Sequence, residues 1–536
     1  MSRTRARSST PAHSIPPGTL PSLVVGVVCL AAYQALAPAV PGDKDSGEFT
    51  LVLATCGLAH PTGYPLYTLA GSAFVRALHA LGMTWAQAAN AFSALGGAVA
   101  MAGVHALTAR LLYRSVPSRN PGLFALLPVL ALALHPVWTQ EATLAEVNSW
   151  HLAWVMVAAL AALRLGETLA RADRAGRPAA GAAAAWGLVV GLGAAHHATS
   201  VLVSLPLTLA LLLLARRHRR IGPGAVVAGI AGLASGLSSV GYVAWRAHHP
   251  AAEQWPELEA TAAGILAHLD GAQFRSFLGR FAPSAIQQTR LAQWVYPLLV
   301  PALAGAAAAW RPPASGATAV RHAFGAAVVL QTGYAFLYGV SDPSPYFLTA
   351  LALGLALAAE ALCSWRPARH AAVAPALAVA LAITMAPGLR AAQARAEAYA
   401  QLDDLVRRMW GAIPPGRAFV VWDDDMASRL RALQQLESSR ADLVVIQPRH
   451  LSHPQPRKRF MREWGFDPVA RWPDEARGEG AGTERGVRLA VESIVTTINE
   501  GSSLPLYVFR PDVPSLRLIQ KHAGDSAAVT TGIPAR

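Results

Sequence analysis

The chain has 536 residues, of which 53% are hydrophobic and only 14% are charged. It is too apolar for a soluble multidomain protein and too long for one compact core, so the composition predicts a polytopic membrane protein. The net charge of +14 does not indicate a nucleic-acid-binding protein, because the arginines stand in short clusters between apolar runs, as in the cytoplasmic loops of membrane proteins.

The basic N-terminal segment precedes an apolar run, from about residue 20 to 40, that is long enough to span a bilayer. A signal peptide has a shorter apolar core, so we expect a cytoplasmic basic tail (1–19) and a retained signal-anchor helix. The run at about 179–215 is too long for one helix and is divided at "AAHHATS", because His196 and His197 would otherwise lie at the bilayer centre. The sequence thus predicts about eleven membrane helices within 20–389, the others being near 86–112, 121–138, 148–165, 223–245, 291–310, 319–340, 345–363 and 370–388.

Charge predicts the orientation of these helices. With a cytoplasmic N-terminus, the arginine clusters between the helices all fall on the cytoplasmic side, as the positive-inside rule requires. This agreement holds only if residues 46–81 do not cross the membrane, so we expect a first outer loop over 41–85. Four further segments then share the outer face: "HPVWTQEATLAEVNSWH", "AAHHATS", "RAHHPAAEQWPELEATAAGILAHLDGAQFRSFLGRF" and "YGVSDPSPYF".

Beyond about residue 390 the chain becomes more polar, and "GRAFVVWDDDMASRLRALQQLESSRADLVVIQPRHL" has the pattern strand, turn, helix, strand. With "PLYVFRPD" as a later strand, this pattern predicts a small extracytoplasmic α/β domain over 390–536. Asp423, Asp424 and Asp425 resemble a metal-binding or nucleotide-binding cluster. No glycine-rich phosphate loop precedes them, so we favour a structural role at a helix N-terminus.

The first outer loop contains the stretch "GDKDSGEFTLVLATCGLAHPTGYPLYTLAG", which begins at Gly42. Asp45 and Glu48 have the spacing of a capping box, which would start the helix "EFTLVLATCGLA". His60 and the proline after it would end that helix, and Pro65 would start the next one. Ionisable groups at membrane depth cost about 2.5–3.5 kcal/mol each, so their convergence on one face indicates a functional site. The alternative is that outer loops are solvated and tolerate charge.

Four segments of the chain resemble a large family of bacterial multi-pass membrane proteins, long catalogued as a domain of unknown function. That family is similar to the eukaryotic O-mannosyltransferases that modify plexins, and it is placed near the GT-C class of glycosyltransferases. The segments are "DSGEF…LATCGLAHPTGYPLYTLAG", "EATLAEVNSWHL", "GLGAAHHATS" and "HLDGAQFR", and the resemblance covers roughly the first 390 residues. The chain departs from the family pattern at Lys44, Thr62 and Asn148, and the C-terminal domain carries no motif of the family.

The resemblance implies a GT-C fold, in which the first outer loop carries a catalytic carboxylate and the donor is a polyprenyl-phosphate sugar. The expected function is an integral-membrane glycosyltransferase that moves the sugar to a protein or glycan hydroxyl on the outer face of the inner membrane. Inverting transfer needs one carboxylate to take the acceptor proton as the anomeric carbon gains oxocarbenium character. Phosphate is already a good leaving group, which nearby cations stabilise.

On this interpretation Asp45 is the first choice for general base, Glu48 the second and Asp43 the third. No cofactor is expected, and a metal site on "DKD" is disfavoured because Lys44 would repel the cation. Arg275 would hold the lipid phosphate, since the guanidinium group binds phosphate through two parallel hydrogen bonds. The predicted substrate-binding residues are His60, Tyr64, Glu146, His151, His197 and Arg275.

Two other classes of protein remain open at this point. A multi-pass transporter would also have many helices, but it should show repeated halves and charges within broken helices. A non-catalytic scaffold for envelope assembly would not need acids and histidines converging at one depth. The expected partners are the donor lipid, membrane lipids and the acceptor, and nucleic acid is not among them.

Overall fold

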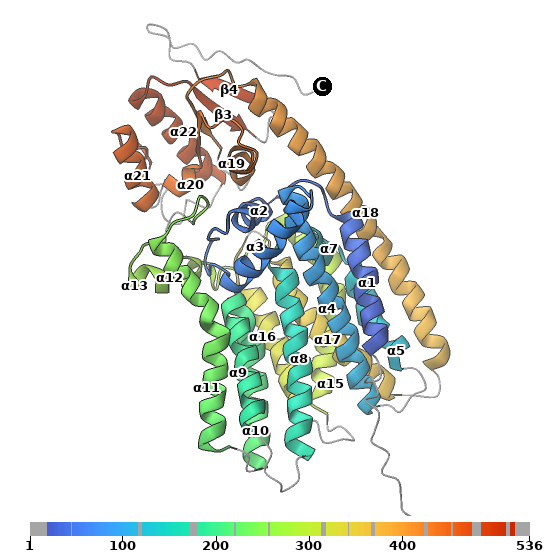
Figure 1. Cartoon of the computed structure of the whole chain (residues 1–536). Coiled ribbons are helices and arrows are strands. Elements are labelled where there is room, and N and C mark those ends of the chain that lie inside the picture. The colour runs from blue at the N-terminus through green and yellow to red at the C-terminus, as the bar shows by residue number, and fades with distance from the viewer. Residues whose placement is uncertain are drawn as a thin grey trace, which may run out of the picture.

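The computed structural model describes residues 19–43, 45–115, 121–171, 179–218, 221–255, 258–311, 318–340, 342–365, 370–422, 427–451, 454–473, 484–510 and 515–519. A bundle of long helices forms one part of the molecule, and a small α/β domain lies beyond one end of it (Figure 1). The predicted helical membrane architecture with a small C-terminal α/β domain is confirmed. The predicted basic tail, except Thr19, lies outside the described residues, as do Lys44 and Asp423–Asp425.

The helix bundle follows the predicted apolar runs. Eight helices of the described residues are long and apolar enough to cross a membrane, or up to nine if the bent pair α6 and α7 is one span. Leu213, Val227 and Val300 are at least 65% exposed on outer helix faces, as lipid contact requires. The helices of the bundle are α1 (Thr19–Leu36), α4 (Trp85–Ser115), α5 (Pro121–Phe124), α6 (Leu126–Ala133), α7 (Pro136–Thr143), α8 (Asn148–Arg171), α9 (Ala179–His196), α10 (Val201–Arg217), α11 (Pro223–Leu237), α12 (Gly241–His248), α14 (Ala285–Arg290), α15 (Tyr296–Ala309), α16 (Thr318–Leu337), α17 (Leu348–Trp365) and α18 (His370–Ala412).

The long apolar run at 179–215 is broken where the adjacent histidines predicted a break. Helix α9 ends at His196, and a short 3₁₀ turn (Ala198–Ser200) leads into α10. The side chain of His197 accepts a hydrogen bond from the backbone N–H of Thr199 and so caps this turn. The α9 and α16 helices lie in the bundle but are not among the eight long apolar helices.

Two short helices of the first outer loop, α2 (Ser46–Thr55) and α3 (Pro65–Ala80), lie at the end of the bundle that faces the α/β domain (Figure 1). Neither is among the candidate membrane spans. Pro65 is the first residue of α3, as predicted. The predicted capping box is wrong, because the Asp45 side chain makes no capping hydrogen bond and Glu48 bonds elsewhere. Helix α2 also ends earlier than predicted, at Thr55, where Cys56 adopts a left-handed conformation.

The α/β domain contains a four-stranded sheet in the order β2-β1-β3-β4. Strands β1 and β2 are parallel, β1 and β3 are parallel, and β3 and β4 are antiparallel. Helix α19 and the end of α18 pack on one face of the sheet, and α21 and α22 pack on the other. The elements are β1 (Ala418–Val421), α19 (Ala427–Leu436), β2 (Leu443–Ile446), α20 (Pro448–Leu451), α21 (Pro454–Trp464), α22 (Glu484–Gly501), β3 (Leu506–Arg510) and β4 (Ser515–Ile519).

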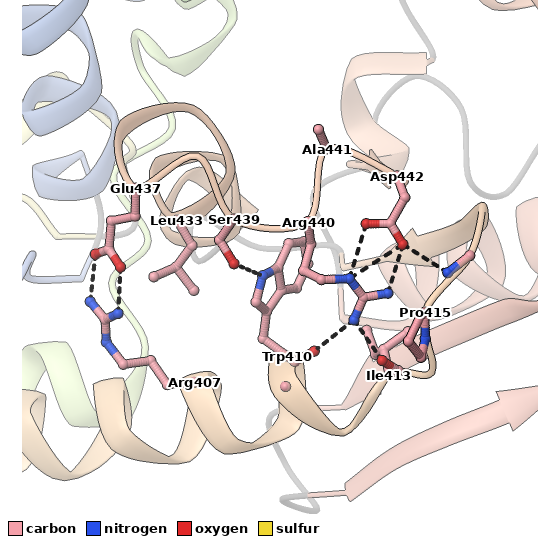
Figure 2. A pocket seen from close by; sticks show the side chains of 12 residues that line it. Arg407, Trp410, Ile413, Pro415, Leu433, Glu437, Ser439, Arg440, Ala441 and Asp442 are labelled. Atoms are coloured by element: carbon pink, nitrogen blue, oxygen red, sulfur yellow. Dashed lines mark hydrogen bonds and ion pairs between the residues drawn. The ribbon is translucent and has the colours of Figure 1, made fainter.

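Helix α18 joins the two parts of the molecule, because it runs along the bundle and continues into the α/β domain (Figure 1). It passes without a break through the predicted domain boundary at residue 390. A hollow of about 800 Å³ lies beside its end. Arg407 makes two 2.6 Å bonds to Glu437 there, and Arg440 lies 2.9 Å from Asp442 (Figure 2). These charged groups pair with one another, so we interpret them as contacts that hold the end of α18 to the α/β domain.

A buried arginine fixes the α/β domain to the first outer loop. Arg429 of α19 is 1% exposed, and its guanidinium lies 3.1 Å from Asp403 of α18. It also donates to the carbonyl oxygens of Pro41 and Gly42, which precede α2. A buried cation needs this many partners to offset its lost hydration. The domain is therefore held directly over α2.

Candidate functional site

A cavity of about 490 Å³ lies at the end of the bundle, between the loops that are predicted to be outer and the α/β domain. Its lining comes from segments far apart in the chain: the first outer loop, the loop after α12, the turn before α17 and the α/β domain. Seven of the nine predicted site residues line it, and the full set of its ionisable and tyrosine residues is Asp45, Glu48, His60, Tyr64, Glu141, Glu146, His197, Glu253, Asp270, Arg275, Tyr334, Tyr338, Asp342, Tyr346 and His450.

Asp45 and Glu48 differ in burial and in their hydrogen bonds within the protein. Glu48 is largely buried, and its Oε1 accepts the backbone N–H of His60 at 2.6 Å. The Nδ1 atom of the His60 ring lies 3.1 Å from Oε2 of the same carboxylate. Asp45 stands one turn earlier at the start of α2, and its side chain is 48% exposed at the cavity. Glu48 therefore orients His60, whereas the Asp45 carboxylate faces the space where a substrate would enter.

The electrostatics of this pair agree with its geometry. Burial raises the pKa of Glu48, but the neighbouring His60 ring and backbone N–H outweigh burial and hold the pKa below the ordinary value. Glu48 is thus charged at neutral pH. The other ring nitrogen of His60, Nε2, is 3.2 Å from the hydroxyl of Tyr64 and 3.9 Å from Oδ2 of Asp45. His60 therefore bridges the buried carboxylate to the exposed one.

Asp43, the third predicted catalytic residue, does not line the cavity. Its carboxylate accepts a hydrogen bond from the hydroxyl of Tyr399 at 2.5 Å. Tyr399 belongs to α18, which also carries Arg395, an arginine near Thr139 and Thr143 of α7. The structure therefore gives Asp43 a role in attaching the first outer loop to α18.

Of the residues predicted from later segments, Glu146 and His197 line the cavity and His151 does not. Glu146 is buried where α7 leads into α8, and its backbone N–H and C=O both bond the Ser93 hydroxyl. His151 lies behind His197, with ring centroids 4.6 Å apart, and its Nε2 is 3.2 Å from the hydroxyl of Thr199. His151 thus supports the wall of the cavity and does not form its surface.

Arg275 lies at the rim of the cavity, in a short 3₁₀ helix (Ala272–Phe277) that follows α13 (Ala262–Leu269). It is 67% exposed, and its guanidinium is 2.6 Å from Asp270. A second arginine, Arg290 of α14, reaches the same side through Asp342, a lining residue 3.0 Å away. Arg275 is therefore a partly solvated cation at the rim of the cavity. Its predicted contact with the donor phosphate stays a prediction.

The loop after α12 contributes two lining residues that sequence reasoning missed, Glu253 and Trp255. This loop pairs with the first outer loop, because the N–H of Leu58 donates to Glu253 O at 3.1 Å and the N–H of Trp255 donates to Leu58 O at 2.9 Å. Gly57 permits this close approach, since a Cβ there would lie 2.1 Å from the carbonyl oxygen of Glu253. The signal was the three acids in "AAEQWPELE", but nothing in their spacing indicates which loop they meet.

Glu253 is an acid with an unusual pKa. Burial raises its pKa to about 7, although Arg431 of α19, 2.7 Å away, opposes this shift, and the nearby Glu48 adds to it. Between the ordinary value of 4.5 and about 7, the folded protein holds a proton that the unfolded chain has released. The free energy of unfolding therefore falls as the pH rises through this window.

We expect Glu253→Gln to stabilise the protein at high pH, by on the order of 1–3 kcal/mol. Above pH 7 the native carboxylate is charged and buried, whereas the amide carries no such cost. Thermal unfolding in detergent at pH 5.5 and pH 8.5 measures the effect, which should be present at pH 8.5 and small at pH 5.5. Glu259→Gln, in the same loop but exposed, is the control. An equal shift at both pH values would contradict this account.

Asp45, Glu48 and His60 also have the spacing of metal ligands, with one ligand atom from each within 4.8 Å of the others. The ligand types would suit a divalent cation. Both oxygens of Glu48 already contact His60, which competes with such a role. The absence of a metal requirement stays a prediction.

The class of this protein, a bundle of membrane helices with an acid-lined cavity under a C-terminal domain, follows from comparison with solved structures. The chain has the GT-C fold: it superposes on ArnT from Cupriavidus metallidurans bound to undecaprenyl phosphate with a TM-score of 0.51 and 14% identity, covering 91% of this chain and 93% of that one. The apo form of ArnT gives a TM-score of 0.49 and 15% identity over 79% and 89% of the two chains. An Archaeoglobus fulgidus oligosaccharyltransferase, in complex with Zn and sulfate, gives 0.48 and 13% over 90% and 67%.

The family resemblance predicted from the sequence is also confirmed. Residues 45–221 match the family model described as the N-terminal domain of the protein O-mannosyl-transferase TMEM260. The matched residues begin at Asp45 and include every predicted site residue except Asp43 and Arg275. No curated protein matches the chain. Fold and family together support a multi-pass membrane glycosyltransferase.

Proposed function

We propose that this protein transfers a sugar from a polyprenyl-phosphate donor to a protein or glycan hydroxyl at the outer face of the cytoplasmic membrane. One observation carries the proposal: the Asp45 carboxylate faces a cavity at the end of a membrane bundle, beside a Glu48–His60 pair that fixes its surroundings. ArnT, which has the same fold, was solved with undecaprenyl phosphate, and this supports a polyprenyl donor.

In the proposed reaction the acceptor oxygen forms a bond to the anomeric carbon as the bond from that carbon to the phosphate oxygen breaks. The acceptor proton passes to Asp45, and the polyprenyl phosphate leaves with the bonding electrons. The cavity suits an amphiphilic donor, because a lipid-linked sugar phosphate presents its reacting bond at the membrane surface. Arg275 would bind the donor phosphate through the two parallel hydrogen bonds of its guanidinium group.

The orientation in this proposal has the N-terminus in the cytoplasm and the α/β domain (390–536) outside, on the grounds of loop charge. The basic clusters of the loops support it, and so does the gathering of the predicted outer segments at the cavity end of the bundle. Cysteine labelling of intact cells from either side, at exposed positions of the α/β domain, tests this orientation.

The function is tested by incubating the purified protein in nanodiscs with a panel of polyprenyl-phosphate monosaccharides, mannose first. Release of polyprenyl phosphate and incorporation of labelled sugar into peptide or glycan acceptors are both measured. Turnover with any donor supports the proposal. Failure of every donor with a folded preparation would favour a transporter or a scaffold.

We expect Arg275→Gln to raise the KM for the donor about tenfold and to change kcat little. The reason is that the arginine contacts the phosphate in both ground state and transition state, while its exposure weakens the contact through solvent screening. Arg280→Gln, which alters a nearby arginine that does not line the cavity, serves as the control. A loss of kcat with unchanged KM would show that Arg275 acts elsewhere.

A further inference from the structure

A second cavity, of about 950 Å³, lies between the loop after α12 and the α/β domain. Three residues, Trp255, Gln447 and His450, line both this cavity and the acid-lined one. The two cavities therefore adjoin at these three residues. Its size is in the range of built ligand pockets, which are about 300–1,000 Å³.

Every residue of strand β2, from Leu443 to Ile446, lines the second cavity, and so does the next residue, Gln447. Among the described residues it is the edge strand of the sheet, with β1 as its one neighbouring strand. The N–H of Trp422, just after β1, donates to Ile446 O at 3.0 Å, so Ile446 is directed toward β1. In a parallel ladder the direction alternates along the strand, so Leu443 and Val445 are directed away from β1.

The outward groups of Leu443 and Val445 differ in their partners. Leu443 is satisfied within the domain, because its N–H donates to Arg440 O at 3.1 Å and its carbonyl accepts from Gln434 at 2.7 Å. Within the described residues, the hydrogen bonds of the structure give Val445 no partner on this side. Val445 therefore presents one N–H and one C=O to the cavity, the two groups through which a further strand pairs.

Two side chains of the same cavity add a buried donor and a buried acceptor. The indole N–H of Trp255 and the side-chain oxygen of Gln435 are buried, and in the described part of the chain neither has a hydrogen-bond partner. Buried polar atoms without partners are costly, so their presence in a cavity indicates a ligand or water that satisfies them. A peptide backbone offers both an acceptor for Trp255 and a donor for Gln435.

We propose that the acceptor is an extended polypeptide segment that binds as an added strand on the open edge of β2, with a serine or threonine hydroxyl carried past Trp255 and His450 to Asp45. This inference rests on the proposed function and specifies its acceptor. A glycan offers no backbone N–H and C=O pair for a strand edge, so the geometry favours a peptide. Because main-chain groups provide the contact, the recognition tolerates varied side chains beside the hydroxyl residue.

The test compares long and short acceptors with one backbone change in the enzyme. Val445→Pro removes the outward N–H but leaves the pairing with β1, which is why proline is tolerated on edge strands. With a peptide of about twelve residues, roughly 40 Å when extended, the KM should rise about fivefold or more for the loss of one hydrogen bond. Transfer to N-acetyl-threonine amide, which is too short to reach β2, should not change. Val445→Ala keeps the N–H and is the matched control.

A second measurement uses the unaltered enzyme, so it does not depend on the folding of a variant. Single ester-for-amide replacements along the peptide remove one N–H at a time. Strand addition predicts weaker binding at the positions whose N–H groups pair with the Val445 carbonyl and the Gln435 side-chain oxygen, and unchanged binding at the other positions, measured by fluorescence anisotropy without any donor. Weakening at no position, or an unchanged KM in Val445→Pro together with unchanged transfer to the short acceptor, would overturn the inference.

Binding and turnover separate this inference from the proposed function. If peptides bind with this position-specific pattern but no donor supports turnover, the proposed function fails and the peptide site stands. If donors turn over with water or the short amide while peptides neither bind nor compete, the function stands and the peptide site fails. If the protein transfers sugar to glycans alone, the function likewise stands and the peptide site fails.

Discussion

Replacing Asp45 by asparagine is expected to lower kcat for sugar transfer by about a thousandfold or more, with little change in the KM for the donor. The amide has nearly the same shape as the carboxylate but cannot take the acceptor proton. Asp45 is 48% exposed and makes no capping hydrogen bond, so α2 should form without its charge. Single-turnover rates and donor affinity, measured on the same nanodisc preparation, separate the chemical step from binding.

The matched control is Asp404→Asn, the same chemical change on an exposed position of α18. It should transfer sugar at the rate of the unaltered protein. If Asp45→Asn retains more than about a tenth of the activity, Asp45 is not the base, because general base catalysis contributes about a hundredfold to ten-thousandfold. Glu48→Gln with a larger loss than Asp45→Asn would move the role to Glu48.

The long helices of the bundle were predictable because eight of them, among the described residues, are long and apolar enough to be recognised without tertiary information. The break at His196 and His197 was predictable for the same reason, since a pair of polar rings at the bilayer centre would be costly. Three of the four strands of the α/β domain, β1, β2 and β3, were found from short apolar runs bounded by turn residues, whereas β4 was not predicted. In each case the determining interaction is local, or is an interaction with lipid.

The capping box failed because tertiary contacts competed with a local one. The spacing of Asp45 and Glu48 fits a cap, but Glu48 accepts the N–H of His60, twelve residues further along the chain. Freed from capping, the Asp45 side chain faces the cavity. The local motif therefore indicated the right residues but predicted the wrong contacts for them. Such departures from local rules are expected where residues at a helix start belong to a functional site.

The contributions of Glu253, Trp255 and the α/β domain were not predictable from one sequence. Leu58 pairs with the loop after α12, and Arg429 binds the carbonyls of Pro41 and Gly42, although these partners are far apart in the chain. Neither contact follows from hydropathy or spacing. The sequence located the acids of the first outer loop, and the tertiary fold determined which of them reach a shared cavity.

Glu48→Ala is expected to reduce both stability and activity, in contrast to Asp45→Asn. The Glu48 carboxylate accepts the backbone N–H of His60 at 2.6 Å and contacts its ring at 3.1 Å, and hydrogen bonds to a charged group contribute about 1.5–3 kcal/mol each. Losing them leaves the His60 N–H without its acceptor and releases the ring that bridges to Asp45. We therefore expect a lower apparent Tm and about a hundredfold loss in kcat.

In both Tm and kcat, Glu48→Gln should fall between the unaltered protein and Glu48→Ala. Its amide oxygen still accepts the His60 N–H, but the charge is lost. Glu397→Ala, on an exposed turn of α18, is the control for removal of an acid. The pH dependence gives a further check: the pKa of Glu48 is depressed in the folded state, so its stabilisation is present above the ordinary value of 4.5 and is lost as the pH falls through the folded value. The difference in Tm between the unaltered protein and Glu48→Ala should therefore be large at pH 7 and shrink on acidification. A difference that does not depend on pH would mean that Glu48 stabilises the loop by packing alone, and that the His60 bridge to Asp45 does not need its charge.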